Sequence, residues 1–515
     1  MMKKMFVAKT AFGAALLSAA LAFTGCGAGG VAARTDTLIV GVVSMHTNLD
    51  PTLNNDIPSA QINMHVFDTL IDLGFDFIPS PNLATHWEWV DPANPTQLRV
   101  ELRQGVLFHN GNPFSARDVQ FSLERASTAP HVAAVAGMIN HVQIINDYEV
   151  IIVLDYPFVP FINFLGHQGL SIVNEQTVTS MGVEAHSQAP VGTGPYRLTN
   201  IVAGDHVELT LWENHWGGYT GLETIIIRVL ADASTRLIAL ETGEIDIMLG
   251  VPAFDHNHVM NHPELTLLRE NSVATSFIAF DTSRPPFNDV RVRHAMNYAL
   301  DIEAIVQTVF MGTQQRATGP IGGLVWGSAA DRLPTFPHNP ARAAELLAEA
   351  GFADGFAVTF FAPQGATVTI DTAEIVQNML APFGIQVSVQ ILEWGAFLEA
   401  SNRGETDILS LAWVPTTGDP DQGLFATFHS SMHGAGGNRA FFTNAQVDAL
   451  LEAGRVETDP VARAQIYYEI QQILREESPW IFFAQGIQAL GIRNNVQGFR
   501  MSPNLINRFW GVSFS

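Results

Sequence analysis

Lysine and cysteine are nearly missing from this chain of 515 residues. Its three lysines, Lys3, Lys4 and Lys9, lie among the first ten residues, and all later Lys/Arg positions are arginines. The body of the chain therefore cannot form a lysine Schiff base, a Walker A phosphate loop or the Ser-x-x-Lys motif of acyl transfer. Its single cysteine, Cys26, cannot form an intrachain disulfide, so the fold must depend on its hydrophobic core.

Positive charge is also scarce, since 26 Lys+Arg face 50 Asp+Glu and the formal net charge is −24. Phosphate binding needs clustered basic residues, so we expect no nucleic-acid partner and no binding to anionic lipid. Apolar residues make up 47 %, which excludes a disordered or fibrous chain and is enough for a large core. The length indicates two or three lobes.

The longest uncharged apolar run, residues 11–23, is too short for a comfortable transmembrane helix but suits the hydrophobic region of a signal peptide. Basic residues precede it, and Phe23-Thr24-Gly25-Cys26 follows. This stretch resembles the bacterial lipobox, although Phe23 stands where Leu is usual. The resemblance implies that residues 1–25 are a lipoprotein signal peptide, that Cys26 is acylated, and that residues 26–35 form a tether. The alternative is an ordinary secretory signal.

Strand patterns dominate the chain up to about residue 280, with buried runs at 37–43, 98–108, 207–212, 224–230, 265–269 and 276–281 and a hairpin of 141–145 with 149–155. Helices and strands then alternate to about residue 485. Asn339-Pro340 and Asp459-Pro460 each combine an N-cap with a proline at the first helical position. The alternation is typical of an α/β lobe.

Five ordered segments carry a family resemblance. They are the 102–119 stretch with Leu102-Arg103-x-Gly105-Val106-x-Phe108-His109; Gly192-Thr193-Gly194-Pro195-Tyr196; Leu240-x-x-Gly243-Glu244-Ile245-Asp246; Pro286-Phe287-x-Asp289-Val290-Arg291; and 444–451. Together they resemble the peptide/nickel class (family 5) of extracellular solute-binding proteins, the receptors of ABC importers. We expect the 192–196 segment to be a tight backbone crossing, since no phosphate-loop continuation follows it.

The resemblance implies an α/β, two-lobed periplasmic-binding-protein-like fold of class II, of the large three-subdomain type, with a hinged ligand cleft. Lobe I would span residues 36–275 with an inserted subdomain at about 55–180. Lobe II would span 276–486, and residues 487–515 would return to lobe I. We expect Arg103, Asp118, Asp289 and Arg291 to form structural ion pairs rather than ligand contacts.

The segment 391–423 matches the cleft wall of lobe II in this family. Trp394 and Trp413 flank it, and indole rings at strand ends supply large contact areas to ligands. The alternative is that both are core residues. Oligopeptide receptors carry an Asp for the peptide ammonium where this chain has Thr416. Positions that can carry carboxylate-binding arginines are Ser401 and Ser410 here.

Other polar residues in this region are further candidates. Thr417 and Asp419 belong to a Thr-Gly-Asp-x-Asp sequence that resembles the glutathione-receptor branch, and Asp419 or Asp421 would supply a shifted anion. Asn438 and Arg439 would meet a ligand carboxylate, or Arg439 would pair with a protein carboxylate. We interpret the His429/His433 pair and the histidines near 256–262 as surface residues rather than a metal site.

The predicted function is capture of a peptide or peptide-like solute and its delivery to an ABC permease, without a cofactor and without catalysis. The protein would be a monomer in the cell envelope, outside the cytoplasm, lipid-anchored to the membrane or periplasmic. The alternatives are a receptor for a nickel chelate, an oligosaccharide or a cell-wall peptide, a tethered sensor, or a carboxylate-dependent hydrolase, although G-x-S-x-G and H-E-x-x-H motifs are absent.

Overall fold

The computed structural model describes residues 36–330 and 332–515. The chain from Thr35 to Ser515 groups into one compact unit. The predicted signal peptide, the acylation site Cys26 and the tether lie outside the described residues, so they stay predictions. In the part of the chain that the structure describes, no helix is long and apolar enough to cross a membrane.

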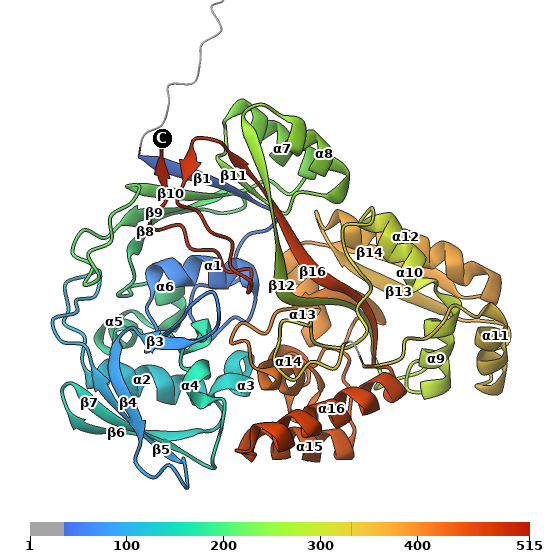
Figure 1. Cartoon of the computed structure of the whole chain (residues 1–515), viewed down its shortest axis with the longest axis horizontal. Helices are drawn as coiled ribbons and strands as arrows, with labels where there is room; N and C mark the ends of the chain where they lie inside the picture. Colours follow the sequence, from blue (N-terminus) through green and yellow to red (C-terminus); the bar gives the residue numbers. More distant parts are fainter. Residues whose placement is uncertain (1–35, 331) are drawn as a thin grey trace, which may run out of the picture. The chain divides into compact units, whose positions relative to one another are not determined.

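A mixed ten-stranded sheet runs through this unit in the order β14-β13-β15-β12-β16-β11-β1-β10-β9-β8 (Figure 1). Its parallel pairs are β1 with β10 and β11, and β13 with β14 and β15. The strands are β1 (Thr37–Val42), β8 (Tyr196–Val202), β9 (His206–Leu211), β10 (Thr224–Val229), β11 (Ile247–Leu249), β12 (Leu265–Phe280), β13 (Ala357–Pro363), β14 (Gln386–Leu392), β15 (Ile408–Trp413) and β16 (Trp480–Arg493).

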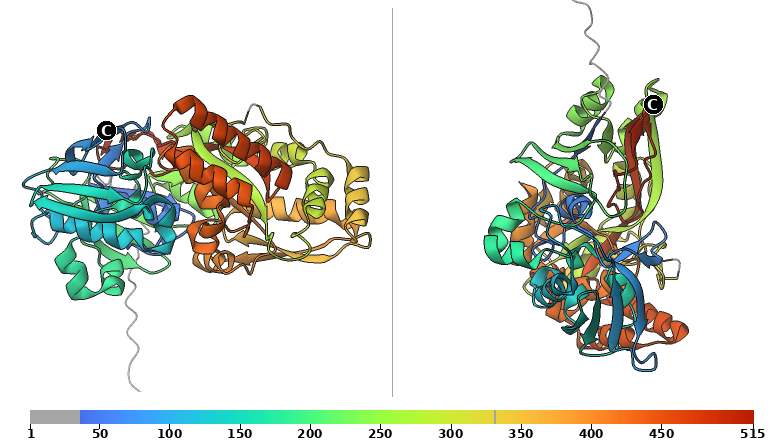
Figure 2. Two further views of the ribbon diagram at one scale, coloured as in Figure 1. Left: turned by 90° about the horizontal axis from the view of Figure 1, so that it is seen from below. Right: turned by 90° about the vertical axis from the view of Figure 1, so that its left-hand side faces the viewer.

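Two long antiparallel strands, β12 and β16, connect the two halves of this sheet (Figure 1, Figure 2). The sequence predicted two separate strands where β12 is continuous, which was wrong. The register of the pair shifts between Asn271 and Thr275, where polar residues interrupt the apolar pattern, so the ladder continues across a bulge. The lobe boundaries proposed at 275/276 and 486/487 fall inside these two strands.

A separate four-stranded sheet, β4-β5-β7-β6, lies within the segment predicted as an inserted subdomain. Its core includes Phe108, Phe114 and Phe161, and α2 begins at a capping box formed by Ser115 and Asp118. The strands are β4 (Ala84–Trp89), β5 (Gln97–Leu102), β6 (Ile139–Asn146) and β7 (Glu149–Leu154). Two short pairs form separate sheets: β2 (Ile71–Leu73) with β3 (Pro79–Pro81), and β17 (Val496–Gln497) with β18 (Ser513–Phe514).

Helices occur in the first half of the chain too, where the sequence patterns indicated mainly strands and no helix was predicted. They are α1 (Ile57–Val66), α2 (Ala116–Ser127), α3 (Ala133–Ala136), α4 (Phe161–Phe164), α5 (Glu175–Met181), α6 (Val183–Gln188), α7 (Ala233–Thr242) and α8 (His256–Asn261). Every residue of α1 from Ser59 to Val66 is buried, so α1 has no polar stripe for sequence periodicity to detect.

The helices of the second half confirm the predicted caps: Asn339 caps α11 and Asp459 caps α16. These helices are α9 (Val290–Ala299), α10 (Ile302–Val309), α11 (Pro340–Glu349), α12 (Thr367–Leu380), α13 (Trp394–Asn402), α14 (Pro420–Phe428), α15 (Ala445–Val456) and α16 (Pro460–Glu477). Short 3-10 turns occur at Pro130–Val132, Gln168–Leu170, Ala253–Asp255, Ala381–Phe383, Ser430–Met432 and Gly434–Gly436.

Two of the family segments have the structural roles expected of them. A Cβ added to Gly192 would lie 2.0 Å from the carbonyl oxygen of Val66, so this crossing requires glycine. Arg291 pairs with Asp289 at 2.5 Å, as predicted.

The other two residues predicted to form ion pairs, Arg103 and Asp118, have no ion-pair partner in the described part of the chain. Asp118 completes the capping box of α2, and its carboxylate accepts hydrogen bonds from the side-chain amide of Asn174 and the backbone N–H of Glu175 rather than from a cation. Arg103 donates to the carbonyl of Asn82 and lies over the ring of Trp216. Both side chains therefore stabilise the fold without an ion pair.

Candidate ligand cavity

A cavity of about 430 Å³ lies at the end of β15, between residues from both halves of the chain. Most of its wall is apolar, with a few polar groups that converge on it. Five of the predicted ligand residues line it: Trp394, Ser410, Trp413, Thr416 and Arg439. This combination of apolar enclosure and few polar anchors is typical of a small-molecule site.

The two predicted indoles enter the wall from different elements. Trp413 is the last residue of β15, and its Nε1 donates to the carbonyl of Gln422 at 3.2 Å. Trp394 is the first residue of α13, its ring stacks on Phe397, and its buried Nε1 has no acceptor among the described residues. A buried N–H without a partner is costly, so Trp394 offers a donor to whatever fills the cavity.

Arg439 brings a positive charge into this wall although the residue is only 5 % exposed. Its Nε donates to Oδ1 of Asn402 at 3.0 Å, and its Nη2 lies 3.4 Å from Oδ1 of Asn55. Within 36–330 and 332–515, no carboxylate forms an ion pair with it. Burial lowers the pKa of Arg439 to about 10, with the nearby charge of Asp56 opposing. The guanidinium therefore has donors to spare for an anion.

The other four predicted ligand residues do not line the cavity. Ser401 is fully buried and its hydroxyl donates to the carbonyl of Leu398. Thr417 donates through its backbone and side chain to Gln422. Asp419 caps α14 and pairs with Arg463, and Asn438 bonds to the loop carbonyls of His429 and Phe442. Asn438 thus supports the turn that carries Arg439.

The first half of the chain supplies wall residues that sequence reasoning missed. They include Asn55, Asp56, His131, His167 and Gln168. Asp56 caps α1, which its Asp-Ile-Pro pattern signals, but that pattern says nothing of a ligand. Burial lowers the pKa of His131, and it lowers the pKa of His167 to about 4, so His167 is neutral at physiological pH.

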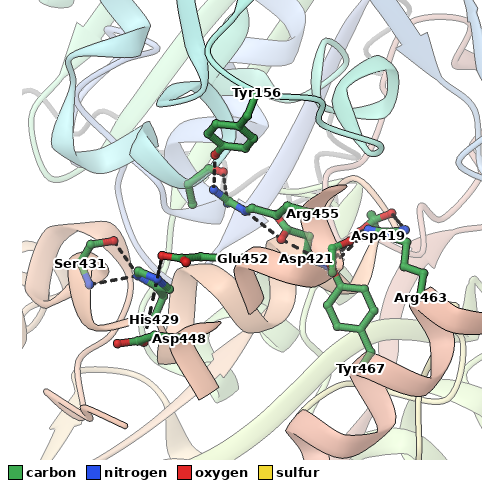
Figure 3. A network of polar contacts seen from close by, with 12 residues as sticks. Tyr156, Asp419, Asp421, His429, Ser431, Asp448, Glu452, Arg455, Arg463 and Tyr467 are labelled. Atoms are coloured by element: carbon green, nitrogen blue, oxygen red, sulfur yellow. Dashed lines mark hydrogen bonds and ion pairs between the residues drawn. The ribbon is translucent and has the colours of Figure 1, made fainter. Parts of the chain in front are cut away.

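A buried polar network lies beside the cavity (Figure 3). Arg455 of α15 donates from Nε and Nη2 to the two oxygens of Asp421, at 3.0 and 3.1 Å. The same guanidinium donates to the carbonyl of Ala134 at 2.8 Å and to the hydroxyl of Tyr156 at 3.2 Å. These contacts join α14 and α15 to the first half of the chain.

The histidines occupy separate environments, and the interpretation as surface residues is wrong for His429 and His256, which packing leaves only 7 % and 6 % exposed. His429 stacks on Phe425 and lies 3.5 Å from Glu452, whereas His433 lies 3.0 Å from the carbonyl of Phe442. His258 pairs with Glu241. Over the described ranges, no group of three or more His, Cys, Asp or Glu is placed to hold a metal ion.

A sequence model described as "Bacterial extracellular solute-binding proteins, family 5 Middle" matches residues 79–434, well over half of the chain. The chain belongs to this family of solute-binding proteins. Heme-binding protein A of Haemophilus influenzae is 30 % identical over 461 residues, which cover 84 % of each chain. Glutathione-binding protein GsiB of Salmonella typhi is 29 % identical over 477 residues, which cover 91 % of this chain and 92 % of the relative.

The fold of this solute-binding protein has solved counterparts. The ABC transporter-associated periplasmic binding protein DppA from Helicobacter pylori, in complex with the peptide STSA, superposes with a TM-score of 0.89 at 25 % identity. The match covers 93 % of this chain and 98 % of that chain. The family and the α/β periplasmic-binding-protein-like fold predicted from the sequence are thereby confirmed.

Proposed function

We propose that this solute-binding protein captures a peptide or peptide-like solute in the cavity beside Trp413 and delivers it to the permease of an ABC importer, without chemical change. The observation that carries the proposal is Arg439, a buried guanidinium in the cavity wall that has no carboxylate partner among the described residues. A ligand carboxylate would complete its hydrogen bonds in the bidentate geometry that arginine favours.

Two further observations support a peptide-like ligand. The free Nε1 of Trp394 would donate to a carbonyl oxygen, and peptide groups carry such acceptors. The relatives named above bind heme and glutathione and, in the solved structure, the peptide STSA. We infer that Trp394, Ser410, Trp413, Thr416 and Arg439 contact the ligand, and that Thr417 and Asn438 act through the residues they hold.

Closure of two lobes around the ligand is part of this proposal, with lobe I at 36–275 and 487–515 and lobe II at 276–486. Contacts between these segments support it. Asn55 donates to the carbonyl of Ala435 and accepts from Arg439, while Arg455 reaches Tyr156. Each of these contacts would break when the segments separate. Ligand bound to Arg439 would therefore favour the closed arrangement.

We propose that the protein works outside the cytoplasm as a monomer attached to the membrane through acylated Cys26. The basic and apolar segment before Cys26 and the tether after it support this assignment. The acidic body would not bind the membrane surface by charge, because anionic lipids attract basic segments.

Native mass spectrometry tests the proposed ligand class. A Cys26→Ser chain, which cannot be acylated, is secreted from a bacterial host and purified without denaturant. We expect mass increments that resolve into short peptides or peptide-like acids. A single sharp increment from a sugar or a nickel chelate would overturn the peptide assignment. Release of a chemically altered product from an added peptide would overturn the absence of catalysis.

A further inference from the structure

A second, smaller pocket of about 110 Å³ adjoins the main cavity and shares Gln168, Thr416 and Ile506 with it. Three distant segments form most of the rest of its wall: residues 67–82 around β2, the loop between β9 and β10, and residues 502–510 near the C-terminus. A water molecule takes about 30 Å³ in the liquid, so the pocket has room for a small functional group.

Asp68 places a buried carboxylate in this pocket, and the residue is 9 % exposed. Its Oδ2 accepts hydrogen bonds from Thr193 Oγ1 and Trp216 Nε1, both at 3.0 Å. Its Oδ1 receives none from the residues that the structure describes. This oxygen is not among the fully buried polar atoms of the described residues, so it is accessible to a donor that enters the pocket.

The cations near the pocket do not satisfy Asp68. Arg508 donates from both Nη atoms to Asp72 and also to the carbonyl of Leu73. His215 Nε2 lies 3.5 Å from Oδ2 of Asp68, and its Nδ1 accepts from the backbone of Gly217. His215 therefore makes no hydrogen bond to Asp68, and its Nε2 has no acceptor among the described residues.

Arg103 is the remaining nearby cation. It lies over the ring of Trp216, donates to the carbonyl of Asn82, and is not part of the pocket wall. Among the side chains that line the pocket, Asp72 and Arg508 balance each other, so the charge of Asp68 is left over.

Aromatic rings form the other side of this pocket, from Trp216, Tyr219 and Trp510. The faces of such rings attract cations, most strongly ammonium and guanidinium groups that have left water. Burial and the negative charges of Asp68 and Asp72 raise the pKa of Tyr219, against the opposing charge of Arg508 and Arg103. The wall therefore combines an unbalanced carboxylate with π faces.

We propose that this pocket is a subsite for a small organic cation, a primary ammonium or a guanidinium, with Oδ1 of Asp68 as its acceptor. Binding of a cation in this pocket does not depend on the proposed function. The proposed function matters only for where the cation comes from: the ligand of the main cavity or a free amine. A ligand with its carboxylate at Arg439 in the main cavity would extend past Thr416 into the pocket. Such a ligand would be zwitterionic, because its cationic group would lie at Asp68. A free amine would occupy the pocket independently of that ligand.

The indole N–H of Trp216 reports directly on this subsite because it donates to Asp68. The full chain carrying Cys26→Ser is labelled with ¹⁵N at its nine tryptophan indoles, and a Trp216→Phe variant assigns the signal. We expect methylammonium to shift this signal saturably with a Kd of about 10 mM, which corresponds to weak single-group binding. Sodium chloride at equal ionic strength should leave the signal in place.

Matched variants keep the test specific. Asp68→Asn should raise the Kd for methylammonium at least tenfold, whereas Asp76→Asn, an exposed acid of the same segment, should not change it. Because Asp68 is buried, Tyr219→Leu at a 40 % exposed wall position serves as a second variant and should weaken binding several-fold. No shift up to about 100 mM, or an equal shift in Asp68→Asn, would overturn the proposal.

The same titration identifies the source of the cation. If the cation belongs to the ligand of the main cavity, protein purified with that ligand should not respond to methylammonium, and protein freed of it should. If the site takes a free amine, both preparations should respond. Either result supports the subsite, and neither depends on which solute occupies the main cavity.

Discussion

Arg439 and Arg455 are two buried arginines, 5 % and 4 % exposed, in neighbouring parts of the second half of the chain. Arg455 pairs with Asp421, lies 3.1 Å from the ring centroid of Phe425, and donates to Ala134. Among the described residues, the hydrogen-bond acceptors of Arg439 are the amide oxygens of Asn402 and Asn55. The fold therefore supplies a carboxylate partner to Arg455, whereas the described residues supply none to Arg439.

The pKa shifts of Arg439 and Arg455 follow this difference in their partners. Burial disfavours the charge on both, but the carboxylate of Asp421 more than offsets it at Arg455, whose pKa is raised. At Arg439 burial prevails and the pKa is lowered to about 10. A buried cation without a carboxylate partner among the described residues needs another group to complete its hydrogen bonds, and we propose the ligand as that group.

The largest expected effect is on stability, from Arg455→Met. This change leaves the carboxylate of Asp421, 0 % exposed, without its partner, and breaking a buried pair in this way costs about 3–5 kcal/mol. Denaturant unfolding followed by circular dichroism measures it. The double variant Arg455→Met/Asp421→Leu should recover much of the loss. A loss below about 1 kcal/mol in the single variant would contradict the pairing argument.

Arg439→Met should affect ligand binding rather than stability. Removing an unpaired buried charge should leave the free energy of unfolding unchanged or raised, whereas affinity for the solute eluted from the native protein should fall roughly 100-fold. Isothermal titration measures the affinity. Arg439→Lys keeps the charge without the planar fork and should lose an intermediate amount. Equal affinity in Arg439→Met and wild type would remove Arg439 from the ligand site.

Trp413→Ala should weaken binding by roughly 2 kcal/mol, because a central indole in an enclosed wall contributes about that much. The matched control is Trp326→Ala, since Trp326 is 43 % exposed and does not line the cavity. The same titration compares the two variants. Similar losses in both would show a general effect of removing an indole rather than a ligand contact.

The smallest effect concerns His167, which also lines the cavity but loses its charge on burial, with a pKa of about 4. The unfolded chain binds this proton near pH 6.5, so the native state loses stability as pH falls below that value. Between about pH 7 and about pH 5.5, His167 should account for about 1 kcal/mol of the loss.

His167→Asn should reduce the fall in unfolding free energy by that amount, and it keeps an acceptor for the backbone N–H of Gly169. Denaturant unfolding at the two pH values measures the difference. An unchanged pH dependence in His167→Asn would show that His167 is protonated in the native state as easily as in the unfolded chain.

Local signals in the sequence predicted part of this fold well. The Asn339-Pro340 and Asp459-Pro460 pairs define helix starts by backbone chemistry alone, and both helices begin there. The continuity of β12 was not predictable, because polar residues near Asn271 interrupt its pattern while pairing with β16 maintains it. Helix α1 was missed because burial on all sides removes the periodicity.

The residues of the candidate site likewise divide into those that the sequence predicted and those that it could not. The predicted second-half residues Trp394, Trp413 and Arg439 lie in the cavity wall because one short stretch and its neighbouring loop form that side. Asn55 and His167 meet them only through tertiary packing, which no local pattern encodes. Asp419 was a reasonable candidate anion for the ligand. It pairs instead with Arg463, which is 44 residues away in the sequence, so no local pattern could indicate this partner.

A crystal structure of the protein purified with its own solute tests the central claim most directly. We predict a carboxylate of the solute within about 3 Å of the guanidinium of Arg439, with Trp394 and Trp413 against the rest of the molecule and the Asp421–Arg455 pair unchanged. A solute bound in the cavity with no polar atom within hydrogen-bonding reach of Arg439 would contradict the account.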